Sequence, residues 1–299
     1  KLFIFEKRRR LMAHLIVTHN APDLDAIASI WLLTRFDAQH YAGSRVAFVN
    51  PGETISLEAA AELGYQLADV THVDTGGGEF DHHDPARASK DFCAASQVYH
   101  YLEKIHPEIK NDLALQEMVN HFLDVDHFGE VFWPESDHPR YQFMLHQIIS
   151  GMDRTQINDD NYQVELGARL LDFVYAGMKG FIEARAQLAE GIVFPLKNGT
   201  AFAVVSSNDE VLTAAQKAGH SLAIKKDEKT GHIRIKARPD SSFDLKQIYE
   251  AILLKDNVGT WYYHPSGKML LNGSHKSNNH KPSPLSLEEI VKIVKDYLS

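Results

Sequence analysis

The chain has 299 residues, 44% apolar residues and a net charge of −9, which is the composition of a globular protein with room for two domains. No apolar run approaches the roughly 20 residues that cross a bilayer, so we expect no membrane contact. The single cysteine, Cys93, excludes an intramolecular disulfide and predicts a reducing, cytoplasmic location.

Charge is distributed unevenly along the chain. The balance of basic over acidic residues is +4 for residues 1–11, −17 for 12–190 and +4 for 191–299. The acidic segment disfavours long nucleic acids but suits divalent cations, and the basic C-terminal third can meet an anionic substrate. A solvated acidic surface without a role explains the same pattern. Residues 1–11 are expected to be peripheral (a targeting segment, an extension or a cloning remnant), with Met12 as the start.

The N-terminal part alternates apolar runs of strand length with helical periodicity. The patterns predict strands at 15–19, 45–50 and 68–76, and helices at 25–36, 56–64, 94–105 and 112–123. This alternation is typical of an α/β fold with a mostly parallel sheet flanked by helices.

The remaining chain changes its pattern near 190–199, where glycines and a proline predict a linker. Before it, residues 140–190 are helical, with a long helix expected at 162–188. After it, the patterns predict strands at 201–207 and 231–239, a helix running into a strand at 213–224, and a final helix at 285–298. We therefore expect one domain at 12–189 and a second, smaller α/β domain at 200–299.

Histidines and carboxylates follow several of these elements. Ligands of open α/β sheets gather at the carboxyl ends of the strands, so we expect side chains there to converge. They stand in the stretches HNAPDLDAIAS, HVDTGG, EFDHHDP and FLDVDHFG. The candidates are His19, Asp23, Asp25, Asp74, Asp81, His82, His83, Asp84, Asp124 and Asp126.

Carboxylate and imidazole groups together form a ligand set for manganese, iron, cobalt or zinc, which magnesium tolerates less well. A cluster so rich in aspartate suits two ions that share one carboxylate, and such a pair activates water for in-line phosphoryl displacement. Each piece alone has a simpler interpretation. An Asp-His-His run can be a polar loop, and Asp23 or Asp25 can cap a helix. Their combination predicts a metal site.

The order of these motifs resembles that of the DHH phosphoesterase superfamily, which includes nanoRNases, cyclic-dinucleotide phosphodiesterases, single-strand exonucleases and family II pyrophosphatases. The likeness covers about residues 14–130. The THN opening, VDTGGGEFDHHD and HPSGKMLLNGS are also similar to the branch typified by the MYG exonuclease, which acts on RNA from its 3′ end. The stretch HNAPDLDAIAS follows the general DHH pattern more closely.

The resemblance implies that the first domain is catalytic and binds two metal ions. It implies that His19 and Asp23 bind one ion and that Asp74 bridges the two. The other ion would be bound by Asp25, His82 and Asp126. Asp124 competes with Asp126 for the last position, and we favour Asp126. His83 is expected to face the substrate phosphate, and Asp81 to orient a histidine. His127 is expected at the surface or behind the ligands.

The C-terminal stretches AFAVVSS, GHIRIKARP and NGSHK resemble the DHH-associated C-terminal domain, which binds the substrate. The resemblance implies that Arg238 and the turn Gly273-Ser274-His275 hold the phosphate or the base. The glycine-rich turn of that domain is reduced here to Asn272-Gly273-Ser274, so the way in which the end of the substrate is recognised stays open. An edge-strand arginine and an ordinary turn explain the same residues.

These inferences predict a metal-dependent phosphohydrolase, similar to 3′–5′ exonucleases, that cleaves phosphodiester bonds in short oligonucleotides or cyclic dinucleotides. We expect two divalent ions, manganese first and magnesium, cobalt or iron as alternatives, and charge stabilisation by His83 and Arg238. The alternatives are a pyrophosphatase, a nucleotide phosphomonoesterase or a non-catalytic nucleotide-binding protein. Base stacking on Trp261, Tyr262 or Tyr263 would favour a nucleotide, although core packing explains them equally. The apolar stripe of 140–190 is compatible with a homodimer.

Overall fold

The computed structural model describes residues 14–83, 91–155, 159–273 and 280–299. The chain forms two compact units, the first ending at Ala176 and the second beginning at Gly177, so the division lies inside helix α7 (Asp160–Gln187). None of the helices in the described ranges combines the length and apolarity needed to cross a bilayer.

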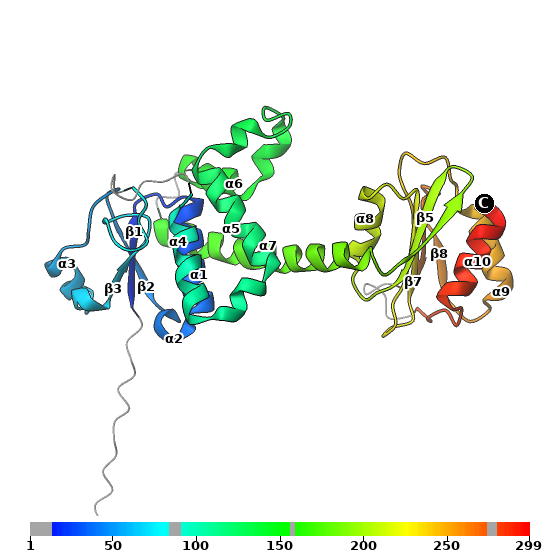
Figure 1. Cartoon of the computed structure of the whole chain (residues 1–299), viewed down its shortest axis with the longest axis horizontal. Coiled ribbons are helices and arrows are strands. Elements are labelled where there is room, and N and C mark those ends of the chain that lie inside the picture. Colours follow the sequence, from blue (N-terminus) through cyan, green and yellow to red (C-terminus); the bar gives the residue numbers. More distant parts are fainter. Residues whose placement is uncertain (1–13, 84–90, 156–158, 274–279) are drawn as a thin grey trace, which may run out of the picture. The chain divides into compact units, whose positions relative to one another are not determined.

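The first unit is built on a three-stranded parallel sheet of β1 (Leu15–His19), β2 (Arg45–Val49) and β3 (Val70–His72), in the order β2-β1-β3 (Figure 1). The central strand is β1, and its residues Leu15 to Val17 have no exposed surface. A continuous apolar run is typical of a parallel strand that is covered on both faces. The third strand is shorter than the predicted 68–76, because Leu67–Asp69 form a 3₁₀ turn before it and the chain leaves the extended conformation at Asp74, where φ is 55°.

Helices cover both faces of this sheet. Figure 1 shows α3 on one side and α1 and α4 on the other. Leu15 and Val17 of β1 pack with Ala60 of α3, and α1 is buried over most of its length between the sheet and its neighbouring helices. The helices before α7 are α1 (Leu24–Phe36), α2 (Ala38–Tyr41), α3 (Leu57–Glu62), α4 (Ala94–Ile105), α5 (Leu113–Asp126) and α6 (Leu145–Arg154), with 3₁₀ turns η2 (Pro107–Asn111), η3 (Gly129–Phe132) and η4 (Pro139–Phe143).

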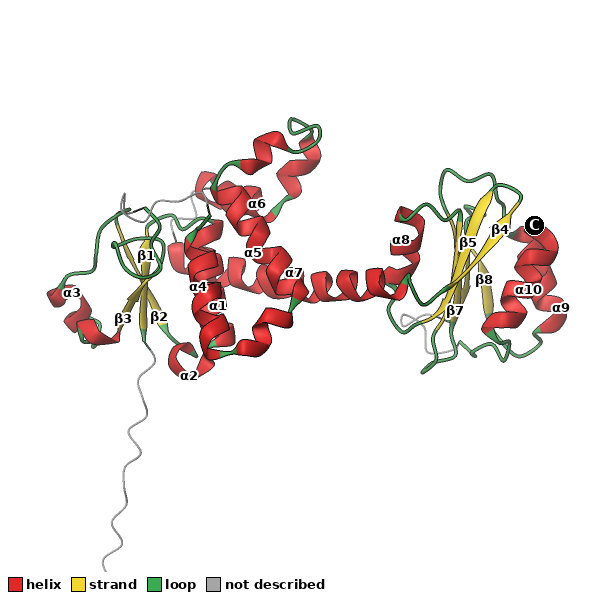
Figure 2. Cartoon of the chain, in the orientation of Figure 1, coloured by secondary structure: helices red, strands yellow, loops and turns green. Residues whose placement is uncertain are grey.

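The second unit has a six-stranded sheet of order β4-β5-β6-β7-β9-β8, in which only the β5–β6 pair is parallel among the described strands. Figure 2 shows α8 against one face and α9 and α10 against the other. Along β5, Ala201 and Ala203 face the cluster of α9 and α10, while Phe202 and Val204 face α8. The elements are β4 (Ile192–Leu196), β5 (Gly199–Val205), α8 (Glu210–Lys217), β6 (Leu222–Lys226), β7 (Ile233–Ala237), α9 (Lys246–Lys255), β8 (Trp261–Tyr263), β9 (Met269–Asn272) and α10 (Leu287–Leu298).

The fold class is confirmed: an α/β chain has one parallel sheet flanked by helices and a second, smaller α/β unit. The predicted linker at 190–199 differs from the structure, because it contains β4, which pairs with β5. Pro195 is tolerated there because β4 is an edge strand, where a missing backbone donor costs no ladder hydrogen bond. The sequence analysis also missed α2, α9 and the short strands β8 and β9.

Candidate metal centre

The loop after β1 presents the first group of polar side chains. His19 ends β1, and its Nδ1 donates a hydrogen bond to the Asn20 carbonyl at 2.9 Å. This leaves Nε2 facing Asp74 Oδ2 at 3.3 Å. Asp23 caps α1, since its Oδ1 accepts from two backbone N–H groups of the first turn. Its other carboxylate oxygen can bind a metal ion, so Asp23 can cap the helix and bind metal at the same time.

Asp25 is held by the N-terminus of another helix. Its side chain is 2% exposed, and its two oxygens accept hydrogen bonds from the backbone N–H groups of Ala94 and Ala95, at 2.7 and 2.8 Å. The positive end of the α4 dipole favours a carboxylate there. Burial and the nearby charges of Asp74 and Asp126 nevertheless raise the pKa of Asp25 well above its ordinary value. Asp25 therefore joins α1 to α4 as well as facing the cluster.

Asp74 lies between two groups of histidines. Its backbone has a left-handed φ of 55°, a conformation that Asp and Asn tolerate better than most residues. Oδ2 lies 3.3 Å from His19, and Oδ1 lies 3.5 Å from both His82 Nε2 and His83 Nδ1. Burial disfavours ionisation of Asp74, but the contacts with His19 and His82 outweigh it and keep its pKa below the ordinary value.

Within the Asp-His-His run, Asp81 orients His83, whereas His82 is buried. Asp81 Oδ2 accepts from the Gly77 N–H at 2.7 Å, and Oδ1 accepts from both the backbone N–H and Nδ1 of His83, at 3.0 and 2.9 Å. The histidine that Asp81 orients is thus His83, whose side chain is 60% exposed. The ring of His82 lies beside that of His83, with centroids 4.2 Å apart, but is buried.

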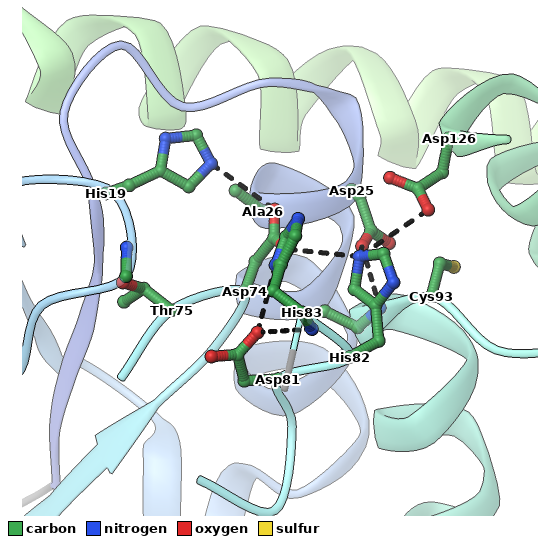
Figure 3. Close-up of polar contacts among 12 residues, drawn as sticks. His19, Asp25, Ala26, Asp74, Thr75, Asp81, His82, His83, Cys93 and Asp126 are labelled. Carbon is green, nitrogen blue, oxygen red and sulfur yellow. Dashed lines mark hydrogen bonds and ion pairs between the residues drawn. The ribbon is translucent and has the colours of Figure 1, made fainter. Parts of the chain in front are cut away.

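His82 is surrounded by carboxylates. Its Nε2 lies 3.5 Å from both Asp74 Oδ1 and Asp126 Oδ2, and 3.8 Å from Asp25 Oδ2 (Figure 3). The contact with Asp74 raises the pKa of His82 to about 9, and burial raises that of Asp126 to about 6. Two residues earlier on α5, Asp124 instead accepts a hydrogen bond from Trp133 Nε1 at 2.7 Å. Of the two competing carboxylates, Asp126 faces the cluster.

Unpaired buried atoms give a direct test of whether a metal fits. Asp74 Oδ1, His82 Nε2 and Asp126 Oδ2 are buried without a hydrogen-bond partner among the described residues. Buried polar atoms are almost always paired, so three such atoms at one place need an explanation. Two atoms that coordinate one ion at about 2.1 Å lie roughly 3–4 Å apart, which matches their separations of 3.5 Å. The donor set fits a divalent cation.

Three groups of side chains have ligand atoms that lie within 4.8 Å of one another: His19, Asp23 and Asp74; Asp74, His82 and His83; and His82, Asp126 and His127. Asp74 and His82 each belong to two of them, and of these two only Asp74 has two oxygens, each of which can bind a different ion. His127 was not predicted as a ligand, and its Nε2 also contacts the Phe92 carbonyl at 3.1 Å. The assignment of each side chain to one ion stays a prediction.

The candidate residues of the second unit have structural partners. Arg238 pairs with Asp240 through two hydrogen bonds, and Gly273 has φ 86° with no room for a side chain. Trp261 is buried, whereas 47% of Tyr262 is exposed. Their contacts with a substrate stay predictions. The other predicted site residues, Asp84, Ser274 and His275, lie outside the described residues.

Comparisons with known proteins add little. No protein-family model matches the chain, and no curated protein matches it. Among solved structures, it is similar to exonuclease RecJ bound to manganese, with 11% identity and a TM-score of 0.30 over 95% of this chain and 90% of that one. It is also similar to an exopolyphosphatase-related protein from Bacteroides fragilis, with 13% identity and a TM-score of 0.27 over 96% and 92%. Likeness at this level carries no argument, and the functional conclusion depends on the site.

Proposed function

We propose that this chain is a metal-dependent phosphohydrolase that cleaves phosphodiester bonds in short oligonucleotides or cyclic dinucleotides. The proposal is supported chiefly by the convergence of Asp74, His82 and Asp126, whose buried ligand atoms lack hydrogen-bond partners among the described residues. Asp74 and His82 lie in the loop between β3 and α4, whereas Asp126 is the last residue of α5, so their meeting is a property of the fold. The acidic character of residues 12–190 favours short substrates over long strands.

Two groups of ligands would hold two ions. His19 and Asp23 lie on one side of Asp74, and His82 and Asp126 lie on the other. When bound, divalent cations lower the pKa of water and neutralise charge on a phosphoryl group. The orientation of His19 suits this role, because Nδ1–H donates to a carbonyl and Nε2 is the nitrogen left to bind an ion once it has released its proton.

His83 is placed to act on the substrate itself. Its Nδ1 is committed to Asp81, so Nε2 on the other side of the ring can donate a hydrogen bond to a phosphoryl oxygen or a proton to the leaving oxygen. The ring lines a pocket of about 520 Å³ together with His82 and Asp126, and most of the surface of the His83 side chain is accessible. Asp81 is itself fixed by Gly77, so the pair is held in orientation before a substrate binds.

The test compares Asp74→Asn with wild type on the dinucleotide pApA, a cyclic dinucleotide and an RNA 5-mer, with manganese and with magnesium. Asn keeps the shape of Asp74 and tolerates its left-handed backbone. We expect a loss of at least roughly 100-fold in rate at saturating manganese, since a shared ligand loses its charge.

Asp69→Asn is the matched control, because Asp69 is an exposed carboxylate at the other end of β3. Its rate should equal that of wild type. Hydrolysis by Asp74→Asn at the wild-type rate under saturating manganese, or no turnover of any phosphodiester by the wild type, rejects the proposal.

A further inference from the structure

The pocket lined by Asp23, Asp25, His82 and Asp126 extends beyond these residues, between the end of α5 and α6. Its wall on this side is apolar, formed by Phe122, Val125, Phe128 and Ile149. The polar groups that interrupt it are His146, Ser150 and Asp153. A pocket of about 520 Å³ is within the range of small-molecule sites, which combine an apolar wall with a few polar groups in this way.

The charge of this wall restricts what it can bind. Among the described residues that line the pocket there is no Lys or Arg, and Asp153 is exposed on the α6 side. A second phosphate next to the scissile one would meet a carboxylate without a compensating cation there, which is unfavourable. The group attached to the scissile phosphate on this side is therefore expected to be uncharged.

Phe128 is presented to the pocket by a strained turn. It has φ 59°, which is a true outlier for a bulky residue, and its side chain is 71% exposed. The next residue must be glycine, because a Cβ on Gly129 would lie 1.9 Å from Asp124 Oδ1, and Asp124 is held by Trp133. An exposed ring on a strained backbone adds little to the core, so its use is expected in binding.

His146 lines the same pocket as Phe128 and has a polar atom without a partner among the described residues. Its Nδ1 is buried and has no hydrogen-bond partner among the described residues. The ring packs edge-on against Trp133, with centroids 6.0 Å apart, and Trp133 in turn stacks on His121. Burial lowers the pKa of His146, so the ring is neutral near pH 7. A neutral imidazole offers a hydrogen bond without attracting a second anion.

We propose that the α6 side of this pocket is a nucleoside subsite, in which the base of the nucleoside next to the scissile phosphate stacks on Phe128 and its polar edge meets His146 and Ser150. The inference rests on the proposed function and deepens it, because it places base recognition inside the first unit. Stacking on an aromatic side chain tolerates every base, since each base has a flat π-face.

The test measures binding to the full-length, manganese-loaded chain by titration calorimetry. The probes are AMP, ribose 5-phosphate and inorganic phosphate, which share the phosphate and differ in base and sugar. We expect wild type to bind AMP at least about 10-fold more tightly than ribose 5-phosphate, because stacking of one base on an aromatic side chain adds binding free energy of about that size. Phe128→Gly should bring this ratio close to one. Its melting temperature should not fall, because glycine suits φ 59°.

Phe132→Ala is the matched control, because Phe132 is 87% exposed on the neighbouring turn but does not line the pocket. It should keep the wild-type ratio. Equal affinity of wild type for AMP and ribose 5-phosphate overturns the inference, as does an unchanged ratio in Phe128→Gly. A change of oligomeric state in Phe128→Gly with an unchanged ratio would assign Phe128 to a subunit contact instead. These outcomes concern binding alone, so they are distinct from a failure of hydrolysis.

Discussion

Asp126→Asn is expected to stabilise the metal-free protein and to weaken its response to metal. The Asp126 carboxylate faces Asp74 and Asp25 across His82, and its Oδ2 has no hydrogen-bond partner among the described residues. Without a metal ion, burial and the negative charge of Asp74 outweigh the attraction of His82, so the ionised form of Asp126 is disfavoured. Asn keeps the shape and removes the charge, so one substitution should have opposite effects on the two forms.

The magnitude follows from the pKa of Asp126, which burial raises from 3.8 to about 6. Each pKa unit corresponds to about 1.4 kcal/mol, so ionisation in the folded state costs up to about 3 kcal/mol. Because the pKa of Asp126 is higher in the folded than in the unfolded state, the free energy of unfolding falls as the pH rises from 3.8 to about 6 and stays at the lower value above that. The gain from Asp126→Asn should thus be absent near pH 4 and complete at pH 8.

The assay is thermal unfolding of the full chain at pH 4, 6 and 8, with and without manganese. At pH 8 we expect a rise of roughly 5–10 °C in the metal-free transition of the first unit, together with a smaller upward shift on adding manganese than wild type shows. Asp124→Asn serves as control, since it weakens the hydrogen bond from Trp133 but keeps the cluster intact. A lower melting temperature of metal-free Asp126→Asn at pH 8 would refute the reasoning.

Two further predictions concern protons and backbone. His19 and His82 have pKa values of about 9 without metal, so both are protonated at pH 7. Manganese binding should therefore release more than one proton, measured by calorimetry in buffers of different ionisation heat, and manganese affinity should rise with pH up to about 9. Binding without any proton release would contradict this. Gly273→Ala should destabilise the second unit by about 2–4 kcal/mol. The reason is that φ of Gly273 is 86° and the new Cβ would lie 2.1 Å from the His232 ring. An unchanged melting temperature would contradict this prediction.

Local pattern was enough for the elements with clear periodicity. The apolar run of β1, the amphipathic helix α4 and the final helix α10 all lie where the sequence predicted them. Strand β4 was missed because Gly191 and Pro195 indicate a break, and only pairing with β5 makes the segment a strand. The three residues of β8 are too few for a period to be visible.

The sequence by itself determined which chemical groups are present and which ends of strands and helices carry them. His19 and Asp74 were expected near each other because the carboxyl ends of adjacent parallel strands share one edge. Only the tertiary structure decided that Asp126 faces His82 while Asp124 faces Trp133. Periodicity within one helix sets the angle between two side chains, but the surface that each one meets depends on which distant segments pack beside that helix.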